Sequence, residues 1–389
     1  MTSTSTTTTL LGVLLSACAA KVAASPGGQP AAAQVRARLA RMVRDQELPG
    51  AQYIAIQADR IALDAHVGVA DAATGQPMEA STVQMAYSIT KVVTAIAVMQ
   101  LVDAGRIDLD APLSRYYAAH PYGPAVTIRS LLAHTSGAPN PMPLDWFVVE
   151  NEPLDRDAAL RSIMAEHAAR NAEPGAGYAY SNIGYWLLEK AIEAAAGEDY
   201  ALYVERRVFA PLGVGSEAAT FDVPPARASA TGHSRRYAPM NLLLWALTPS
   251  RYWARPHGQW SRAARVQPLG RGYGGLYTSA SALAEILRDL LRPTPALLSA
   301  GARDRLLAEQ HTRDGASTGA TLGWVIGELD GVRYLGKQGG GLGFHGNVRM
   351  YPALGLATVL LANRTEISSG PIDARSDALD APFVGALNR

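Results

Sequence analysis

The sequence SITKVVTAIAVMQLVDA, residues 88–104, predicts a buried helix in the first third of the chain. Its side chains are apolar almost all round (Val92, Val93, Ile96, Val98, Met99 and Leu101). A helix that is hydrophobic on every face belongs in the interior of a large fold. Gly105 follows at the position where a left-handed C-terminal cap is common.

The motif Ser88-Ile89-Thr90-Lys91 places a hydroxyl and an amine on one face of this helix, because residues i and i+3 lie one above the other. A serine hydroxyl is too weak an acid to attack a carbonyl at neutral pH unless a base lies beside it. A lysine against an apolar wall has its charged form disfavoured and can act as that base. Lys91 is one of only four lysines among 35 basic residues, and arginine, which fills the other positions, cannot give up its proton.

Two further segments carry side chains suited to chemistry. Tyr180-Ser181-Asn182 lies between a Pro-Gly loop and an apolar helix, and a tyrosine phenol can relay protons if nearby cations lower its pKa. Lys337-Gln338-Gly339 ends a predicted strand and continues into Gly340 and Gly341. A cation beside glycines that let backbone approach a ligand suits a carboxylate or a developing oxyanion. Taken singly, each segment also has a purely structural interpretation: a packed loop tyrosine and a surface strand end.

Strand-like runs occur at both ends of the chain and helical runs between them. Alternating or β-branched segments lie at residues 52–57, 61–69, 332–336, 347–351 and 356–362, and the clearer helices at 161–172, 184–195 and 281–291. We therefore expect an α/β (α+β) fold, in which an antiparallel sheet formed from both termini is flanked by helices. A mostly helical subdomain, about residues 127–310, is inserted into a domain spanning 34–370, and residues 371–389 are expected to form a tail.

The overall composition excludes several classes of protein. A net charge of +1 gives no reason to expect nucleic acid as a partner. The eight histidines are scattered without metal-ligand spacing, so no metal and no cofactor are expected.

The first 33 residues have the pattern of a leader and tether. Residues 10–15 form a short apolar core, too short to span a bilayer, and Leu15-Ser16-Ala17-Cys18 follows it, similar to the lipobox of bacterial lipoproteins. We expect export to the periplasm, with membrane attachment through a lipidated Cys18. The absence of Lys and Arg from residues 1–9 keeps a cytoplasmic location as the alternative.

The order Ser-x-x-Lys, Tyr-x-Asn, Lys-x-Gly resembles that of the penicillin-recognising serine hydrolases: class C β-lactamases, DD-peptidases and related esterases. Each pattern occurs at a separation similar to that of the family, and the resemblance covers roughly residues 35–365. Further stretches are also similar to that family (residues 68–71, 107–112, 131–137, 274–280 and 339–344).

The resemblance implies a role for each motif residue. Ser88 is the nucleophile, Lys91 assists its deprotonation, and Tyr180 relays the proton to the leaving group. Lys337 lowers the pKa of Tyr180 or holds a substrate carboxylate, and the N–H groups of Ser88 and Gly340 form the oxyanion hole. Gly339, Gly340 and Asn182 contact the substrate, or Asn182 bonds Lys91. His134 is expected to be structural.

The expected function is that of a serine acyl-hydrolase that cleaves an ester or amide through an acyl-enzyme. A D-alanyl-D-alanine carboxypeptidase, an esterase and a class C-like β-lactamase would each fit these motifs. Substrates are small molecules or peptidoglycan fragments. Gln338 stands where the lactamases and peptidases usually have threonine, which disfavours efficient β-lactam hydrolysis. A different class stays open: a penicillin-binding or sensor protein acylated at Ser88 without turnover. The apolar segment 237–260 is either a wall for acyl chains or ordinary core.

Overall fold

The computed structural model describes residues 28–141, 146–237, 248–365 and 369–388. Cys18 and most of the expected leader lie outside these ranges. Within them, no helix is long and apolar enough to cross a membrane.

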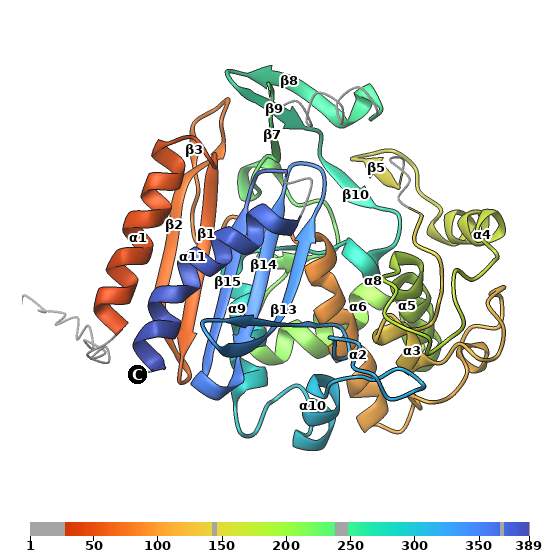
Figure 1. The fold of residues 1–389 in the computed structure, drawn as a ribbon. Helices are drawn as coiled ribbons and strands as arrows, with labels where there is room; N and C mark the ends of the chain where they lie inside the picture. The colour runs from red at the N-terminus through yellow and green to blue at the C-terminus, as the bar shows by residue number, and fades with distance from the viewer. Residues whose placement is uncertain (1–27, 142–145, 238–247, 366–368, 389) are drawn as a thin grey trace, which may run out of the picture.

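A seven-stranded sheet built from the two ends of the chain forms the centre of the fold (Figure 1), with the order β12-β13-β14-β15-β1-β2-β3. The amino-terminal strands are β1 (Gly50–Gln57), β2 (Arg60–Asp71) and β3 (Gln76–Pro77). The carboxy-terminal strands are β12 (Val325–Leu329), β13 (Val332–Gly340), β14 (His345–Tyr351) and β15 (Leu356–Ala362). The two groups meet where β1 pairs antiparallel with β15. The predicted fold class is therefore confirmed.

Helices α1 (Gly28–Arg44) and α11 (Ser369–Leu387) cover one face of the sheet (Figure 1). The expected tail 371–389 is therefore wrong over most of its length, because Ile372, Leu379 and Phe383 are buried against the sheet and α1. The expected tether also ends too late: α1 already includes residues 28–33, and Ala31 is buried.

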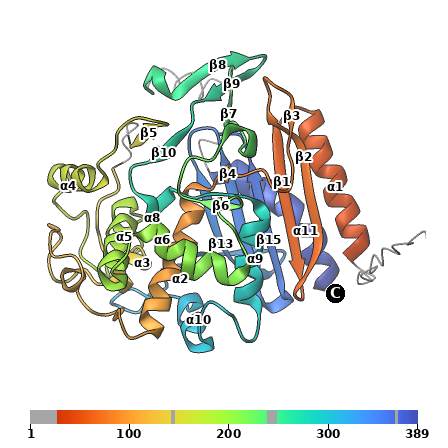
Figure 2. The same ribbon diagram turned by 180° about the vertical axis from the view of Figure 1, so that it is seen from behind.

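The other face of the sheet carries α2 (Thr90–Asp103) and α9 (Ala280–Leu291), seen in front of the strands in Figure 2. The predicted buried helix is confirmed as α2, in which every residue from Thr90 to Met99 is buried. It packs between the sheet side and the inserted helices, chiefly α5 (Asn182–Ala196) and α8 (Arg271–Gly274).

The middle of the chain contains more strand than expected. Its other helices are α3 (Ile128–Leu132), α4 (Arg156–Glu166), α6 (Tyr200–Val204) and α10 (Ala300–Leu307). Short strands form a ladder β4-β11-β6 (Gln84–Met85, Tyr277–Thr278, Ala219–Thr220), a ladder β7-β9-β8 (His233–Arg235, Trp260–Ala263, Trp253–His257) and the pair β10-β5 (Val266–Pro268, Phe147–Val149). Strands of two to five residues are too short to show a hydrophobic period. The helix predicted at 161–172 begins earlier, because Asp155 caps it by accepting from the Ala158 N–H.

Candidate active site

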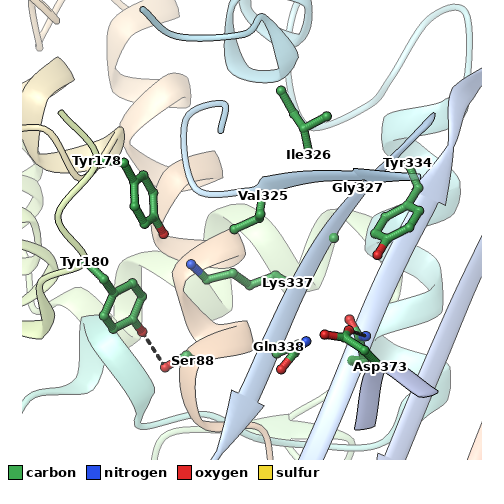
Figure 3. A pocket seen from close by; sticks show the side chains of 12 residues that line it. Ser88, Tyr178, Tyr180, Val325, Ile326, Gly327, Tyr334, Lys337, Gln338 and Asp373 are labelled. Carbon is green, nitrogen blue, oxygen red and sulfur yellow. Dashed lines mark hydrogen bonds between the residues drawn. The ribbon is translucent and has the colours of Figure 1, made fainter. Parts of the chain in front are cut away.

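Ser88 lies in a single 3-10 turn, Tyr87–Ile89, immediately before α2. Tyr87, the residue before it, has a φ of 46°, an unfavourable conformation for a bulky side chain. The turn is held in place because the Tyr87 hydroxyl donates to the Leu342 carbonyl at 2.7 Å and its ring packs edge-on against Phe147. This anchoring presents Ser88 at the wall of a cavity of about 610 Å³ (Figure 3).

The Lys91 amine is fully buried beneath Ser88 and surrounded by three oxygens. Nζ lies 2.8 Å from Asn182 Oδ1, 2.7 Å from the Tyr273 carbonyl oxygen and 3.2 Å from Ser88 Oγ. Burial, and secondarily the charge of Lys337, hold the pKa of Lys91 well below its ordinary value. A neutral amine has two N–H donors and one lone pair. If the two carbonyl oxygens accept the two N–H groups, the lone pair faces the Ser88 hydroxyl.

Tyr180 lies on the other side of Ser88, with its hydroxyl 2.7 Å from Ser88 Oγ. The expectation that cations lower the pKa of this phenol is wrong for the free protein: burial raises the pKa of Tyr180, and the hydrogen bond to Ser88 only partly opposes that effect. Tyr180 is therefore protonated at neutral pH and can donate to Ser88.

His134 packs under Tyr180, with the two ring centroids 4.5 Å apart. Its Nδ1 accepts the Ser181 N–H at 3.2 Å, and burial lowers the pKa of its imidazole well below the ordinary value. The ring orients the Tyr180 loop and, among the described residues, has no hydrogen bond to Ser88 or Lys91.

Lys337 reaches into the same cavity from β13, and its Nζ lies 5.1 Å from the centroid of the Tyr180 ring. The side chain is only 4% exposed, and burial lowers its pKa to about 7. No carboxylate of the described residues forms an ion pair with Lys337. Burial therefore makes the neutral form of Lys337 accessible near neutral pH.

Gly339 allows the end of β13 to lie directly against the turn that carries Ser88, and Gly340 makes room for the His345 ring. A Cβ at Gly339 would sit 1.9 Å from the Ala86 carbonyl oxygen and 3.0 Å from the Ser88 nitrogen. A Cβ at Gly340 would lie 2.9 Å from the His345 ring. Only glycine at position 339 lets the backbone of β13 and the Ser88 N–H lie this close together.

Several residues around the cavity were not predicted from the sequence. Tyr273 supplies the carbonyl that orients Lys91, and Tyr178, Tyr334, Asn347 and Asp373 line the cavity. The short Gly-rich run 270–275 was a usable signal for Tyr273. Asp373 had no local signal, because α11 brings it in from the far end of the chain.

The segment 237–260 contributes less than expected. Residues 238–247 lie outside the described ranges. The Trp253 indole donates to Thr248 and Trp260 is buried beside His233, and neither tryptophan lines the cavity. The described part of this segment is therefore no wall for an acyl chain.

Comparison with known proteins places this geometry in a family. The Beta-lactamase family profile matches residues 35–381. The chain is 29% identical over 382 residues to Esterase EstB of Burkholderia gladioli, covering 88% of this chain and 93% of that protein. It is 27% identical over 337 residues to Penicillin-binding protein 4 of Amycolatopsis lactamdurans, covering 82% of each.

The fold is also similar to that of solved structures with lower sequence identity. The crystal structure of D-amino acid amidase from Ochrobactrum anthropi SV3 complexed with D-phenylalanine superimposes with a TM-score of 0.78, covering 92% of this chain and 99% of that chain at 18% identity. The profile match spans nearly all of the described residues and includes all three motifs. The chain therefore belongs to the Beta-lactamase family and is a serine hydrolase of the β-lactamase fold.

Proposed function

We propose that this protein hydrolyses carboxylic esters through an acyl-enzyme formed on Ser88. The observation that carries the proposal is the hydrogen-bonded series Tyr180–Ser88–Lys91 at the wall of a cavity large enough for a small substrate.

Acylation begins when the Ser88 oxygen attacks the substrate carbonyl and the neutral Lys91 amine accepts the hydroxyl proton. The N–H groups of Ser88 and Gly340, brought together by Gly339, stabilise the resulting oxyanion. The protonated Tyr180 phenol donates its proton to the leaving oxygen as the tetrahedral intermediate collapses, and the phenolate then takes up the proton that Lys91 accepted from Ser88. A water molecule attacks the acyl-enzyme by the reverse sequence of proton transfers.

Esters are favoured over the alternatives by charge. β-Lactams and D-alanyl-D-alanine peptides carry a carboxylate that needs a charged partner, whereas an ester does not, and burial lowers the pKa of the expected partner, Lys337. Gln338 stands beside it in place of a hydroxyl. The alignment with Esterase EstB covers 93% of that protein, and this similarity supports an ester as the substrate.

The test is a turnover panel containing p-nitrophenyl butyrate, nitrocefin and a D-alanyl-D-alanine peptide. We expect the ester to be hydrolysed with the highest kcat/KM, and Ser88→Ala to lose at least about a thousandfold of that activity. Ester hydrolysis that survives in Ser88→Ala would refute the proposal.

The second candidate function is that of a penicillin-binding or sensor protein, in which Ser88 is acylated but the acyl group is not hydrolysed. This function would use the same residues as the esterase. Deacylation distinguishes the two: a label from a fluorescent penicillin that persists for hours, together with absent ester turnover, would favour the binding protein. We also propose export, with attachment through Cys18, from the leader pattern alone. Radiolabelled palmitate incorporated into the wild type and lost in Cys18→Ala tests it.

A further inference from the structure

The far end of the active-site cavity is acidic, in contrast to the end at Ser88. Figure 3 shows Lys337 extending toward Tyr178 and Tyr180, whereas Gln338 and Asp373 lie together on the other side of the cavity. Because Gln338 pairs with Asn347 across the sheet, these two side chains share the face that α11 covers. The cavity thus extends from the lysine side of β13 to the α11 side.

The acidic end contains more negative than positive charge. Arg349 is the one cation at its centre among the described residues, and three carboxylates of α11 surround it. Its guanidinium lies 2.7 Å from Asp377, 3.1 Å from Asp373 and 3.5 Å from Asp380. Burial raises the pKa of Asp380, but even with that group neutral one negative charge remains unbalanced.

Asp373 is the member of this cluster that faces the cavity. Its side chain is 39% exposed, and both Arg349 and Asn347 Nδ2 donate to the same oxygen, Oδ1. No donor to Oδ2 is found among the described residues. One carboxylate oxygen thus remains available to a group bound in the cavity.

Asn347 provides a second, independent observation. The residue is 3% exposed and lines the cavity, yet its Oδ1 has no hydrogen-bond partner in the described part of the chain. Its Nδ2 donates to Asp373 and to Ser376 Oγ, each at 3.2 Å. The contact with a carboxylate fixes which end of the amide is the donor, so the unpartnered end is an acceptor. A buried acceptor without a partner costs free energy unless a ligand or water donates to it.

We propose that Asp373 and Asn347 form a subsite for a cationic, hydrogen-donating group, so that the preferred substrates carry an ammonium away from the scissile bond. This inference rests on the proposed function, since it names the substrate class of the same site. Two acceptors with excess negative charge attract an ammonium and repel a carboxylate. The arrangement also separates the ammonium from Lys337.

The test compares esters that differ in one group. On the acyl side, p-nitrophenyl 6-aminohexanoate is compared with p-nitrophenyl heptanoate, in which a methyl replaces the ammonium. On the leaving-group side, 6-aminohexyl butyrate is compared with heptyl butyrate, in which a methyl again replaces the ammonium. We expect the charged ester of at least one pair to have a kcat/KM about tenfold higher. Asp373→Asn should reduce that ratio to near one, and Asp373→Glu should restore part of it.

Asp377→Asn is the matched control, because Asp377 binds the same arginine but does not line the cavity. Its ratio should fall clearly less than that of Asp373→Asn, because Asp377 adds charge to the acidic end but offers no acceptor to a group in the cavity. Two results would overturn the proposal. One is a wild type with nearly equal kcat/KM for the charged and the neutral ester of both pairs. The other is an Asp377→Asn variant that loses as much of this preference as Asp373→Asn does. If Asp373→Asn fails to fold, the wild type alone decides: hexylammonium should inhibit heptanoate hydrolysis more strongly than hexanoate does. If the wild type hydrolyses neither the neutral nor the charged esters, that result would refute the proposed function itself.

Discussion

Replacing Lys337 by methionine should stabilise the folded protein at neutral pH, although it removes an active-site residue. The amine is 4% exposed and has no carboxylate partner among the described residues, and burial lowers its pKa to about 7. In the unfolded chain a lysine titrates near 10.4. Between these two values the unfolded state binds more protons than the native state, so wild-type stability rises with pH across that window.

The size of the effect follows from the two pKa values. Proton linkage costs the folded wild type about 4 kcal/mol at pH 7 and less than about 1 kcal/mol at pH 10.5. Methionine has a similar length and no charge, and an imperfect fit costs about 1 kcal/mol. We expect Lys337→Met to raise the free energy of unfolding by about 2–4 kcal/mol at pH 7, and the gain to vanish by about pH 10.

Urea denaturation of both proteins at pH 7 and pH 10 measures this difference. Lys190→Met is the control, because Lys190 is paired with Asp157 at 2.7 Å and Glu193 at 2.5 Å, and its side-chain hydrogen bonds to these partners raise its pKa despite burial. That variant should be less stable than the wild type at pH 7. A Lys337→Met protein that is no more stable at pH 7, or whose gain is independent of pH, would refute the reasoning.

The other variants probe the geometry around Ser88. Asn182→Leu removes the oxygen that orients the Lys91 amine, and kcat/KM for p-nitrophenyl butyrate should fall about a hundredfold while KM changes little. Gly339→Ala drives a Cβ into the Ala86 carbonyl and should lower the free energy of unfolding by about 2 kcal/mol and abolish ester turnover, as measured by urea titration and rate assays. Gly301→Ala, at an open helical position, should be neutral or stabilising in the same assays. His134→Asn keeps an acceptor for the Ser181 N–H, so kcat should fall less than about tenfold; a loss as large as that of Ser88→Ala would show that the ring takes part in the chemistry.

Local spacing predicted the parts of the site that lie on one element. Ser88 and Lys91 are three residues apart at the start of α2, so their contact follows from helix geometry. The pKa of Tyr180 could not be predicted in this way, because it depends on burial produced by residues far away in the sequence.

Helix α11 was not predicted from the sequence because its apolar stripe is interrupted. It places Asp380 toward the sheet, where the hydroxyls of Tyr53, Tyr351 and Thr358 donate to the carboxylate. A buried carboxylate and the internal Pro382 obscure the apolar stripe that would identify a helix from sequence. Because α11 was not predicted, neither was the acidic end of the cavity.

Peptide mapping of a covalent adduct tests the central claim most directly. The wild type is treated with a fluorophosphonate, digested and analysed by tandem mass spectrometry, with Ser88→Ala treated in parallel. We predict one stoichiometric adduct on the Ser88 oxygen and none in the variant. An adduct on another residue, or equal labelling of Ser88→Ala, would contradict the assignment of Ser88 as the nucleophile.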